Sequence, residues 1–226
     1  MKKVSILMLL GLLLSPAAAV PARAALEWGE LLLNDHQSGY LYRATSELKD
    51  PGPYEFGPYG GHNLFDKNPA TCWAEGRPGP GLGEALYVGV NKYERTVHIL
   101  NGYHKSPDLF HKNNRVRQLR LTMFAGFFRP DRTTEIFLSF DAVPYPRAEL
   151  VTLEDSRRPQ EITLPWDWTD LETFMYEAAP SRPPAEEVPG VPKDLEEKYI
   201  LRLEILQVYP GSQYDDTCLS ELWLSR

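Results

Sequence analysis

The short polar segment Asp66-Lys-Asn68-Pro-Ala-Thr71 has the residue types that bind a hard cation. It offers a carboxylate, an amide and a hydroxyl, and its proline bends the backbone between them. Calcium takes about six to eight oxygen ligands, several of which are backbone carbonyls exposed by a tight loop. The segment therefore predicts a structural calcium ion. The alternative is an Asx turn, in which Asp66 and Thr71 bond only to local backbone groups.

A second set of residues has the types that bind a sugar. An aromatic side chain offers a flat surface for the C–H face of a sugar ring, and polar side chains fix the positions of the hydroxyls. Residues of these types lie near predicted turns: Tyr103, Asn113, Arg115, Tyr214, Asp215 and Asp216. The alternative is structural, with Tyr103 plugging a turn and the two aspartates supporting Arg115 or Lys105. Trp166 and Trp168 form either an exposed aromatic pair or an anchor for the Pro-rich segment that follows.

Patterns typical of enzymes are weak. The neighbouring Asp215 and Asp216 point to opposite faces if they lie on a strand, so they do not form the facing carboxylate pair of a glycosidase. His98, His104 and His111 match no common zinc spacing. The sequence also lacks the glycine-rich and serine-centred fingerprints of phosphate loops, dinucleotide sites and hydrolases. We therefore predict that the protein is not an enzyme.

The first 24 residues have the pattern of a secretory signal peptide. Lys2 and Lys3 precede an apolar run from Val4 to Leu14, and small residues lead to Ala24, after which we predict cleavage. The run is shorter than the roughly 20 residues of a membrane span, and no Cys occurs before Cys72 to carry a lipid anchor. The sequence predicts a secreted or periplasmic protein without a membrane span.

The composition is that of a globular domain with an acidic surface. The chain has 226 residues, of which 42% are hydrophobic, and a formal net charge of −7. A length of this order fits one domain with a sizeable core. Nucleic acid binding draws on clustered Lys and Arg, so the acidic balance argues against a nucleic acid partner.

Short alternating apolar runs predict an all-β fold. Five runs alternate in this way, over residues 86–90, 97–99, 119–123, 136–140 and 199–205. Irregular spacing and the lack of long helical patterns favour an antiparallel β-sandwich. Helix is not excluded at two places: residues 26–33 and 170–179 could each form about two helical turns, the second capped by Thr169 or Asp170. Residues 180–196 are predicted to form an exposed Pro-rich loop.

Four segments in a fixed order resemble a known family. They run from Asn63 to Gly76, from Asn101 to Ser106, from Asn113 to Arg115 and from Tyr209 to Leu222. Together they resemble the discoidin-like (coagulation factor 5/8 type C) galactose-binding-like domains, and more narrowly the glycan-recognising translocation domain of streptococcal NAD glycohydrolase. The resemblance covers residues 41–226. It follows a signal peptide over 1–24 and an N-terminal extension over 25–40.

The resemblance implies a jelly-roll β-sandwich that binds rather than catalyses. It implies an exported module that recognises a glycan or glycoconjugate. The alternative is a protein interaction or envelope-structural domain that uses the same scaffold without a sugar. The chain is too short to add the NAD-cleaving half, and the Pro-rich insertion over 180–196 departs from the family pattern.

The resemblance also implies particular site residues. In the family a calcium loop is joined by a Glu from the terminal strand, which implies the ligands Asp66, Asn68, Thr71 and Glu221. The opening loop lies near the last strand, so the only two cysteines, Cys72 and Cys218, are predicted to form a disulfide in an oxidising compartment. The alternative is two buried free thiols. Trp73 is expected in the core.

Overall fold

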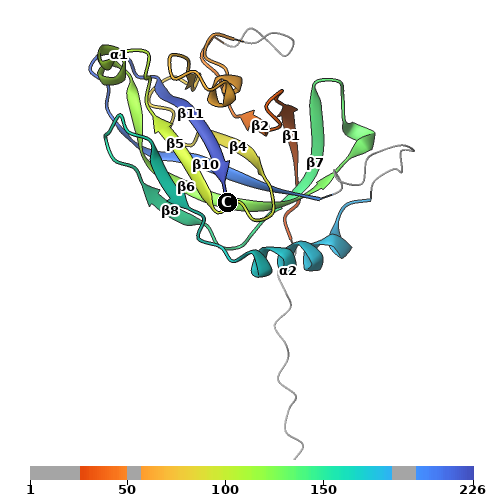
Figure 1. Cartoon of the computed structure of the whole chain (residues 1–226). Coiled ribbons are helices and arrows are strands. Elements are labelled where there is room, and N and C mark those ends of the chain that lie inside the picture. The colour runs from red at the N-terminus through yellow and green to blue at the C-terminus, as the bar shows by residue number, and fades with distance from the viewer. Residues whose placement is uncertain (1–25, 50–56, 185–196) are drawn as a thin grey trace, which may run out of the picture.

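The computed structural model describes residues 26–49, 57–184 and 197–226. The predicted signal peptide, and the Pro-rich segment from residue 185 to 196, lie outside these residues. The described residues fold into two β layers with short helices at their edges (Figure 1). The strands are almost all antiparallel, which confirms the predicted sandwich.

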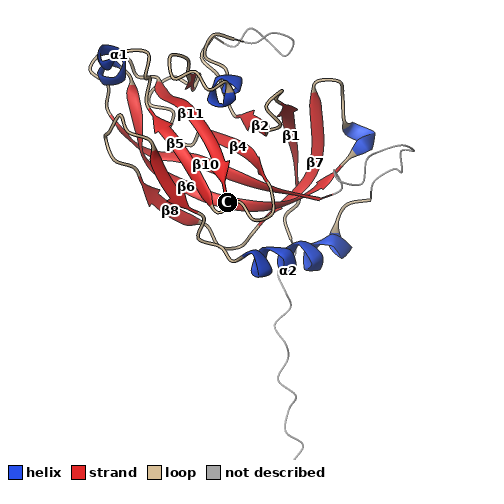
Figure 2. Ribbon diagram, viewed as in Figure 1, coloured by secondary structure: helices blue, strands red, loops and turns tan. Residues whose placement is uncertain are grey.

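One layer holds most of the described strands (Figure 2). Its members are β1 (Gly29–Asp35), β2 (Leu41–Ala44), β4 (Ala85–Val90), β6 (Asn114–Phe128), β7 (Phe137–Pro144), β8 (Glu149–Thr152) and β10 (Glu197–Tyr209). The pairings β10–β4, β4–β2, β2–β1, β1–β7, β7–β6 and β6–β10 close this layer into a ring. The six strands of this ring have no open edge among them, whereas β8 pairs with β6 outside the ring. Unpaired strand edges promote association.

The other layer contains β3 (Trp73–Ala74), β5 (Thr96–Asn101), β9 (Gln160–Thr163) and β11 (Thr217–Ser225). β5 lies between β11 and β9, and β3 pairs with β11. The layers meet where the start of β11 runs parallel to the start of β6, with Thr217 opposite Asn114. This junction brings together segments that are about a hundred positions apart in the sequence.

Five helical segments complete the described fold. They are α1 (Pro107–Lys112), α2 (Trp168–Ala178) and the 3-10 turns η1 (Gly61–Phe65), η2 (Pro130–Arg132) and η3 (Ala179–Ser181). α2 matches the helix predicted over 170–179, but its N-cap is Asp167, whose carboxylate accepts from the Thr169 N–H at 2.7 Å. Asp167 precedes both predicted caps, so the helix starts earlier.

The core lies between the layers, as the alternation predicts. Trp73 is fully buried there, as expected, with its indole N–H donating to the Ser46 carbonyl at 2.9 Å. Leu121 and Leu203 of the ring layer pack in the same cluster as Leu222 of β11. Apolar burial of this kind supplies about 25 cal/mol per Å² of surface removed from water.

The structure excludes one of the two alternatives for Trp166 and Trp168 and corrects the helix at the N-terminus. Trp166 and Trp168 do not form an exposed pair, because both are buried in the core and donate their indole N–H to the Arg147 and Glu94 carbonyls. The helix predicted over 26–33 is instead strand β1, whose Leu33 is fully buried. Pairing with β2 and β7 satisfies this backbone, so the predicted N-terminal extension over 25–40 contributes a strand to the ring.

Candidate functional site

The loops at the α1 end of the sandwich hold the predicted sugar-contacting residues (Figure 1). Tyr103 follows β5, Asn113 follows α1 and Arg115 begins β6. Tyr214, Asp215 and Asp216 lie in the loop between β10 and β11. The antiparallel ladder places these strand ends at one edge of the molecule, although the segments are far apart in the sequence.

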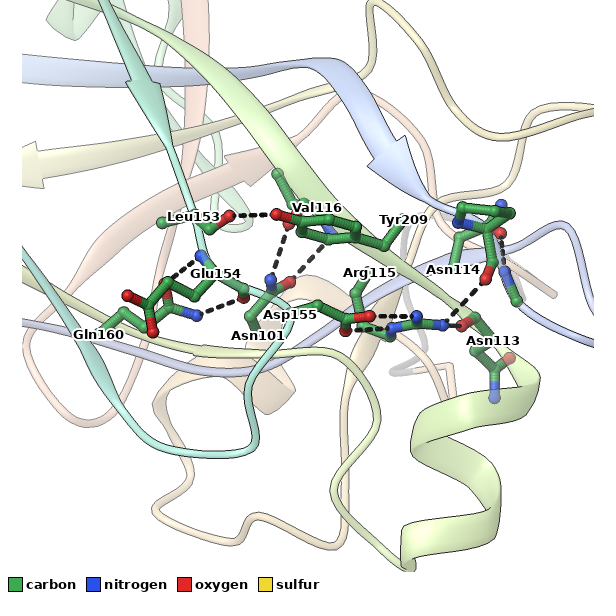
Figure 3. A network of polar contacts seen from close by, with 12 residues as sticks. Asn101, Asn113, Asn114, Arg115, Val116, Leu153, Glu154, Asp155, Gln160 and Tyr209 are labelled. Carbon is green, nitrogen blue, oxygen red and sulfur yellow. Dashed lines mark hydrogen bonds and ion pairs between the residues drawn. The ribbon is translucent and has the colours of Figure 1, made fainter.

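Arg115 is the centre of a buried polar network (Figure 3). Its Nε and Nη2 donate to the two carboxylate oxygens of Asp155 at 3.0 and 2.9 Å. Its Nη1 donates to the carbonyls of Asn113 at 2.8 Å and Pro210 at 3.2 Å, and its guanidinium lies 5.3 Å from the centre of the Phe110 ring. Arg115 therefore joins three loops. Its partner is Asp155, which the sequence did not suggest, and not Asp215 or Asp216.

The Asn-Gly turn after β5 is shaped by close contacts. Asn101 is fully buried, and its side chain donates to the Val116 carbonyl at 2.7 Å and accepts from the Val116 N–H at 2.9 Å. It thus takes the place of a backbone pairing between β5 and β6. Gly102 has a φ of 87°, and a Cβ there would lie 2.7 Å from the Arg115 Cγ. Only glycine fits this turn.

Asn114 holds the β10–β11 loop in place (Figure 3). Its side chain donates to the Asp215 carbonyl at 2.5 Å and accepts from the Gly211 N–H at 2.6 Å. Its backbone N–H donates to the Asp216 carbonyl at 3.0 Å. The sequence interpretation missed Asn114, and the signal that could have revealed it was its position between two selected residues.

Glu75 fastens the loop after β3 to the same end. Its side chain is fully buried and accepts from the N–H groups of Arg77 at 2.8 Å and Thr217 at 3.3 Å. The Thr217 hydroxyl in turn donates to the Pro80 carbonyl at 2.8 Å. Burial raises the pKa of Glu75 above its usual range. Glu75 and Thr217 therefore join the loop after β3 to the start of β11.

Two further members of the predicted set have structural contacts. The Asn113 side chain is buried and donates to the Leu109 carbonyl at 2.8 Å, which closes the C-terminus of α1. Tyr103 packs over the two cysteines and lies edge-on to Tyr59, with ring centres 6.4 Å apart. Burial raises the pKa of Tyr103 to about 12. This position matches the alternative in which Tyr103 plugs the turn.

The exposed part of the set is the β10–β11 loop. The Tyr214 side chain is 41% exposed, Asp215 is exposed and Asp216 is half-buried. Burial and the neighbouring Asp215 raise the pKa of Asp216 above its usual range. The Tyr214 ring and Asp215 are therefore exposed, with the half-buried Asp216 beside them, on a loop whose backbone is held by Asn114 and Arg115.

The predicted cation loop forms an Asx turn. The Asp66 carboxylate accepts from the Asn68 N–H at 2.8 Å and from the Thr71 hydroxyl at 2.7 Å. The Thr71 hydroxyl also donates to the Asn68 carbonyl at 2.7 Å, and Lys67 has a φ of 60°. The Asx turn that the sequence offered as the alternative to a calcium loop is thus present. This turn brings the oxygen-bearing groups of the loop close together.

The surroundings of Glu221 show whether a cation would fit beside this loop. Its side chain is buried, and its Oε1 has no hydrogen-bond partner. Burial and the neighbouring Asp66 raise the pKa of Glu221 to about 7, while the N–H groups of Lys67 and Asn68 act in the opposite direction. A buried carboxylate oxygen without a partner beside a second carboxylate suits a cation. In the described chain no three His, Cys, Asp or Glu residues converge, so amide, hydroxyl and carbonyl oxygens would complete the ligand set.

Cys72 and Cys218 are neighbours and are free thiols in this structure. Cys218 pairs with Ala74 across β3 and β11, which places Cys72 diagonally opposite on the same face. Both are buried. A hydrogen bond with Cys72, together with burial, raises the pKa of the Cys218 thiol well above its usual value.

Comparison with known families identifies the chain. The family model described as the NAD glycohydrolase translocation F5/8 type C domain matches residues 39–225. The protein belongs to this family. The matched range contains every residue of the predicted binding, metal and disulfide sets, and it confirms the discoidin-like resemblance.

Solved structures align with this F5/8 type C domain at low identity. Arabinofuranosyltransferase AftD from mycobacteria is 14% identical over 93% of this chain, which covers 11% of that protein, with a TM-score of 0.44. The module CpGH89CBM32-5 from Clostridium perfringens, in complex with GalNAc-β-1,3-galactose, is 12% identical over 86% of this chain and 99% of its own, with a TM-score of 0.41. An F5/8 type C domain from Bacteroides fragilis is 14% identical over 87% and 95%, also with a TM-score of 0.41. A comparison with curated proteins gives no match.

The described residues contain no helix long and apolar enough to cross a membrane. The longest helix there, α2, has 11 residues and carries acidic side chains. A spanning helix needs roughly 20 predominantly apolar residues.

The Arg115 network predicts a large difference between two arginines. Arg115→Ala should lower the free energy of unfolding by about 3 kcal/mol, because it leaves buried carbonyls and the Asp155 carboxylate without their donor. Arg147→Ala is the matched control, since that side chain is 58% exposed and pairs with Glu149 at the surface. It should cost less than about 1 kcal/mol. Urea denaturation measures both, and equal losses would contradict the anchoring role of Arg115.

Proposed function

We propose that this F5/8 type C domain is an exported, non-catalytic module that binds a glycan or glycoconjugate. The observation that carries the proposal is the contrast at the α1 end. Arg115 and Asn114 are buried and fix the loop backbones, while Tyr214 and Asp215 remain exposed on the loop they hold. Exposed polar and aromatic side chains on a rigid scaffold are typical of binding loops.

The exposed residues provide complementary contacts for a sugar. The Tyr214 ring offers a flat apolar face, and the carboxylates of Asp215 and Asp216 accept hydrogen bonds from hydroxyls. Asn113, Arg115 and Tyr103 contribute by positioning, since their side chains are engaged in the network or packed over the cysteines. Of the predicted ligand set, the β10–β11 loop is thus proposed to make the direct contacts.

The second candidate is a protein-binding role on the same scaffold. The family is described as a translocation domain, and a role in translocation suggests contact with another protein. An envelope-structural domain is the related form of this alternative. Both would use the same exposed loops without a sugar ligand.

A glycan array on the purified protein, with calcium and again with chelator, tests the proposal. We expect saturable binding to a related group of glycans, and at least a tenfold loss of affinity in Tyr214→Ala and Asp215→Ala. Their melting temperatures should stay at the wild-type value because both side chains are exposed. Tyr176→Ala on α2 is the control, since Tyr176 is 82% exposed and lies outside the loop. A blank array from folded protein would favour the protein-binding alternative.

We propose that a calcium ion binds at Asp66, Asn68, Thr71 and Glu221. Its chemistry would be structural, because a cation offsets the repulsion between the Asp66 and Glu221 carboxylates. The unpartnered Glu221 Oε1 supports this proposal. The ion would hold the loop after η1 against β11.

Calcium should raise the melting temperature of the wild-type protein, and the rise should vanish in Glu221→Gln. A ligand that binds only the folded state stabilises it by RT ln(1 + [L]/Kd), about 2.7 kcal/mol at a hundredfold excess over Kd. Glu161→Gln is the control, because Glu161 carries a 73% exposed side chain on β9. Thermal unfolding with calcium and with chelator measures the effect. The same rise in Glu221→Gln would show that the ion binds elsewhere.

We propose that Cys72 and Cys218 form a disulfide after export. The two thiols would lose two protons and two electrons to a thiol oxidase or an exchanging disulfide. This disulfide would close the long loop of chain between Cys72 and Cys218. In the chain-entropy model, closing a loop of that length stabilises a fold by roughly 4 to 5 kcal/mol, less any strain. The packing of Cys72, directly before β3, against Cys218 on β11 supports the pairing.

A reducing agent should therefore lower the melting temperature of the exported wild-type protein and leave that of Cys72→Ala unchanged. Peptide mapping without reductant should recover the segments around Cys72 and Cys218 linked together. Two thiols that alkylate in freshly exported, denatured protein would contradict the disulfide.

A further inference from the structure

Three exposed basic residues lie at the α1 end of the molecule. Arg157 and Arg158 belong to the loop between β8 and β9, and Lys105 belongs to the turn that leads into α1. The Arg157 Nη2 donates to the His104 carbonyl at 3.4 Å, which brings this guanidinium to the residue before Lys105. We call these three residues the basic patch. The patch contrasts with the rest of the chain, whose formal net charge is −7.

The β8–β9 loop that carries the two arginines has a fixed backbone (Figure 3). The Gln160 side chain accepts from the Glu154 N–H at 2.7 Å and donates to the Glu154 carbonyl at 2.9 Å, which closes the loop. Asp155 ties the loop to the buried Arg115 through both carboxylate oxygens. Because the loop is already ordered, a ligand does not have to order it on binding.

The Arg157 guanidinium itself is oriented by two contacts. It lies 6.0 Å from the centre of the buried Phe110 ring, a distance typical of a cation–π contact, and it donates to the His104 carbonyl. A guanidinium carries several N–H donors, and this carbonyl occupies one of them. The remaining donors are available to an acceptor from outside the protein.

The carboxylates nearest the basic patch are already engaged. Asp155 uses both oxygens for Arg115, and Asp108 on α1 pairs with Lys112 at 2.7 Å. Within residues 26–49, 57–184 and 197–226, no ion pair joins a carboxylate to a member of the patch. The positive charge of the patch therefore has no counter-charge in the described chain, and an anionic ligand would supply one.

We propose that the basic patch binds the anionic group of an acidic glycan, either a sugar carboxylate or a sulfate ester. The planar fork of an arginine matches the paired oxygens of both groups, and a lysine adds a compact charge beside it. The inference rests on the proposed glycan function and names its ligand class. Arg115 binds both Asp155 of the β8–β9 loop and the Pro210 carbonyl before Tyr214, so the patch and the exposed tyrosine belong to one rigid end.

A glycan array of matched pairs tests this inference. Each pair contains an acidic glycan and its neutral counterpart, such as a sialylated and a desialylated chain or a sulfated and an unsulfated galactoside. We expect the acidic member of the sialylated pairs, the sulfated pairs or both to bind at least tenfold more tightly. The affected pairs identify the anion as a carboxylate or a sulfate. Added salt should reduce the preference, because it screens exposed charges.

Two variants assign the preference to the basic patch. Arg157→Gln and Lys105→Gln should each weaken binding of the acidic member about tenfold and leave binding of the neutral member unchanged, because only the anion loses a charged donor. Arg147→Gln is the charge-matched control, since that side chain is 58% exposed and pairs with Glu149 away from the patch. It should retain the preference. Melting temperatures near the wild-type value show that each variant is folded.

The outcomes separate this inference from the proposed function. If neutral and acidic members bind equally well, or if the preference persists when Arg157→Gln and Lys105→Gln are combined, the inference is wrong and the proposed function still holds. An equal loss of preference in Arg147→Gln would show an effect of net charge and would also contradict a site at the patch. If folded protein binds no member of any pair, both the proposed function and this inference fail.

Discussion

A buried guanidinium is the constraint on which the α1 end of the molecule depends. Arg115 lies between the two layers' strand ends, and a charge in that position is costly unless it is fully paired. Asp155, the carbonyls of Asn113 and Pro210, and the Phe110 ring satisfy it. Three loops must therefore keep their places for the fold to be stable. Rigidity at this end is a consequence of satisfying one charge.

Buried asparagines satisfy the backbone groups at places where the hydrogen-bonded strand ladders end. Asn101 supplies both a donor and an acceptor to Val116, and Asn114 does so for the β10–β11 loop. Backbone groups that leave a ladder still need partners, and these side chains provide them without exposing the backbone to water. The exposed Tyr214 and Asp215 consequently project from a defined backbone, as binding loops require.

Strand β11 links the remaining candidate features. Cys218 faces Cys72, Glu221 faces Asp66, and Trp223 stacks on His98, all along one strand. The strand is paired with β3, β5 and the start of β6, which leaves it little freedom to shift. The proposed cation and the proposed disulfide would both act on the same rigid element. Loss of either feature should therefore affect the other chiefly by lowering the stability of the fold.

The sequence by itself determined the features that depend on near neighbours. Alternation over 86–90 and 199–205 specified β4 and β10, and Asp66 with Thr71 specified their turn. Four ordered segments specified the family. Tertiary structure decided which side chains are exposed and which are buried or engaged in contacts. The Leu-rich β1 is a strand because β7 pairs with it, Trp166 is buried because the core covers it, and Arg115 is an anchor because Asp155 reaches it. Each of these depends on a contact between distant segments, which local pattern does not encode.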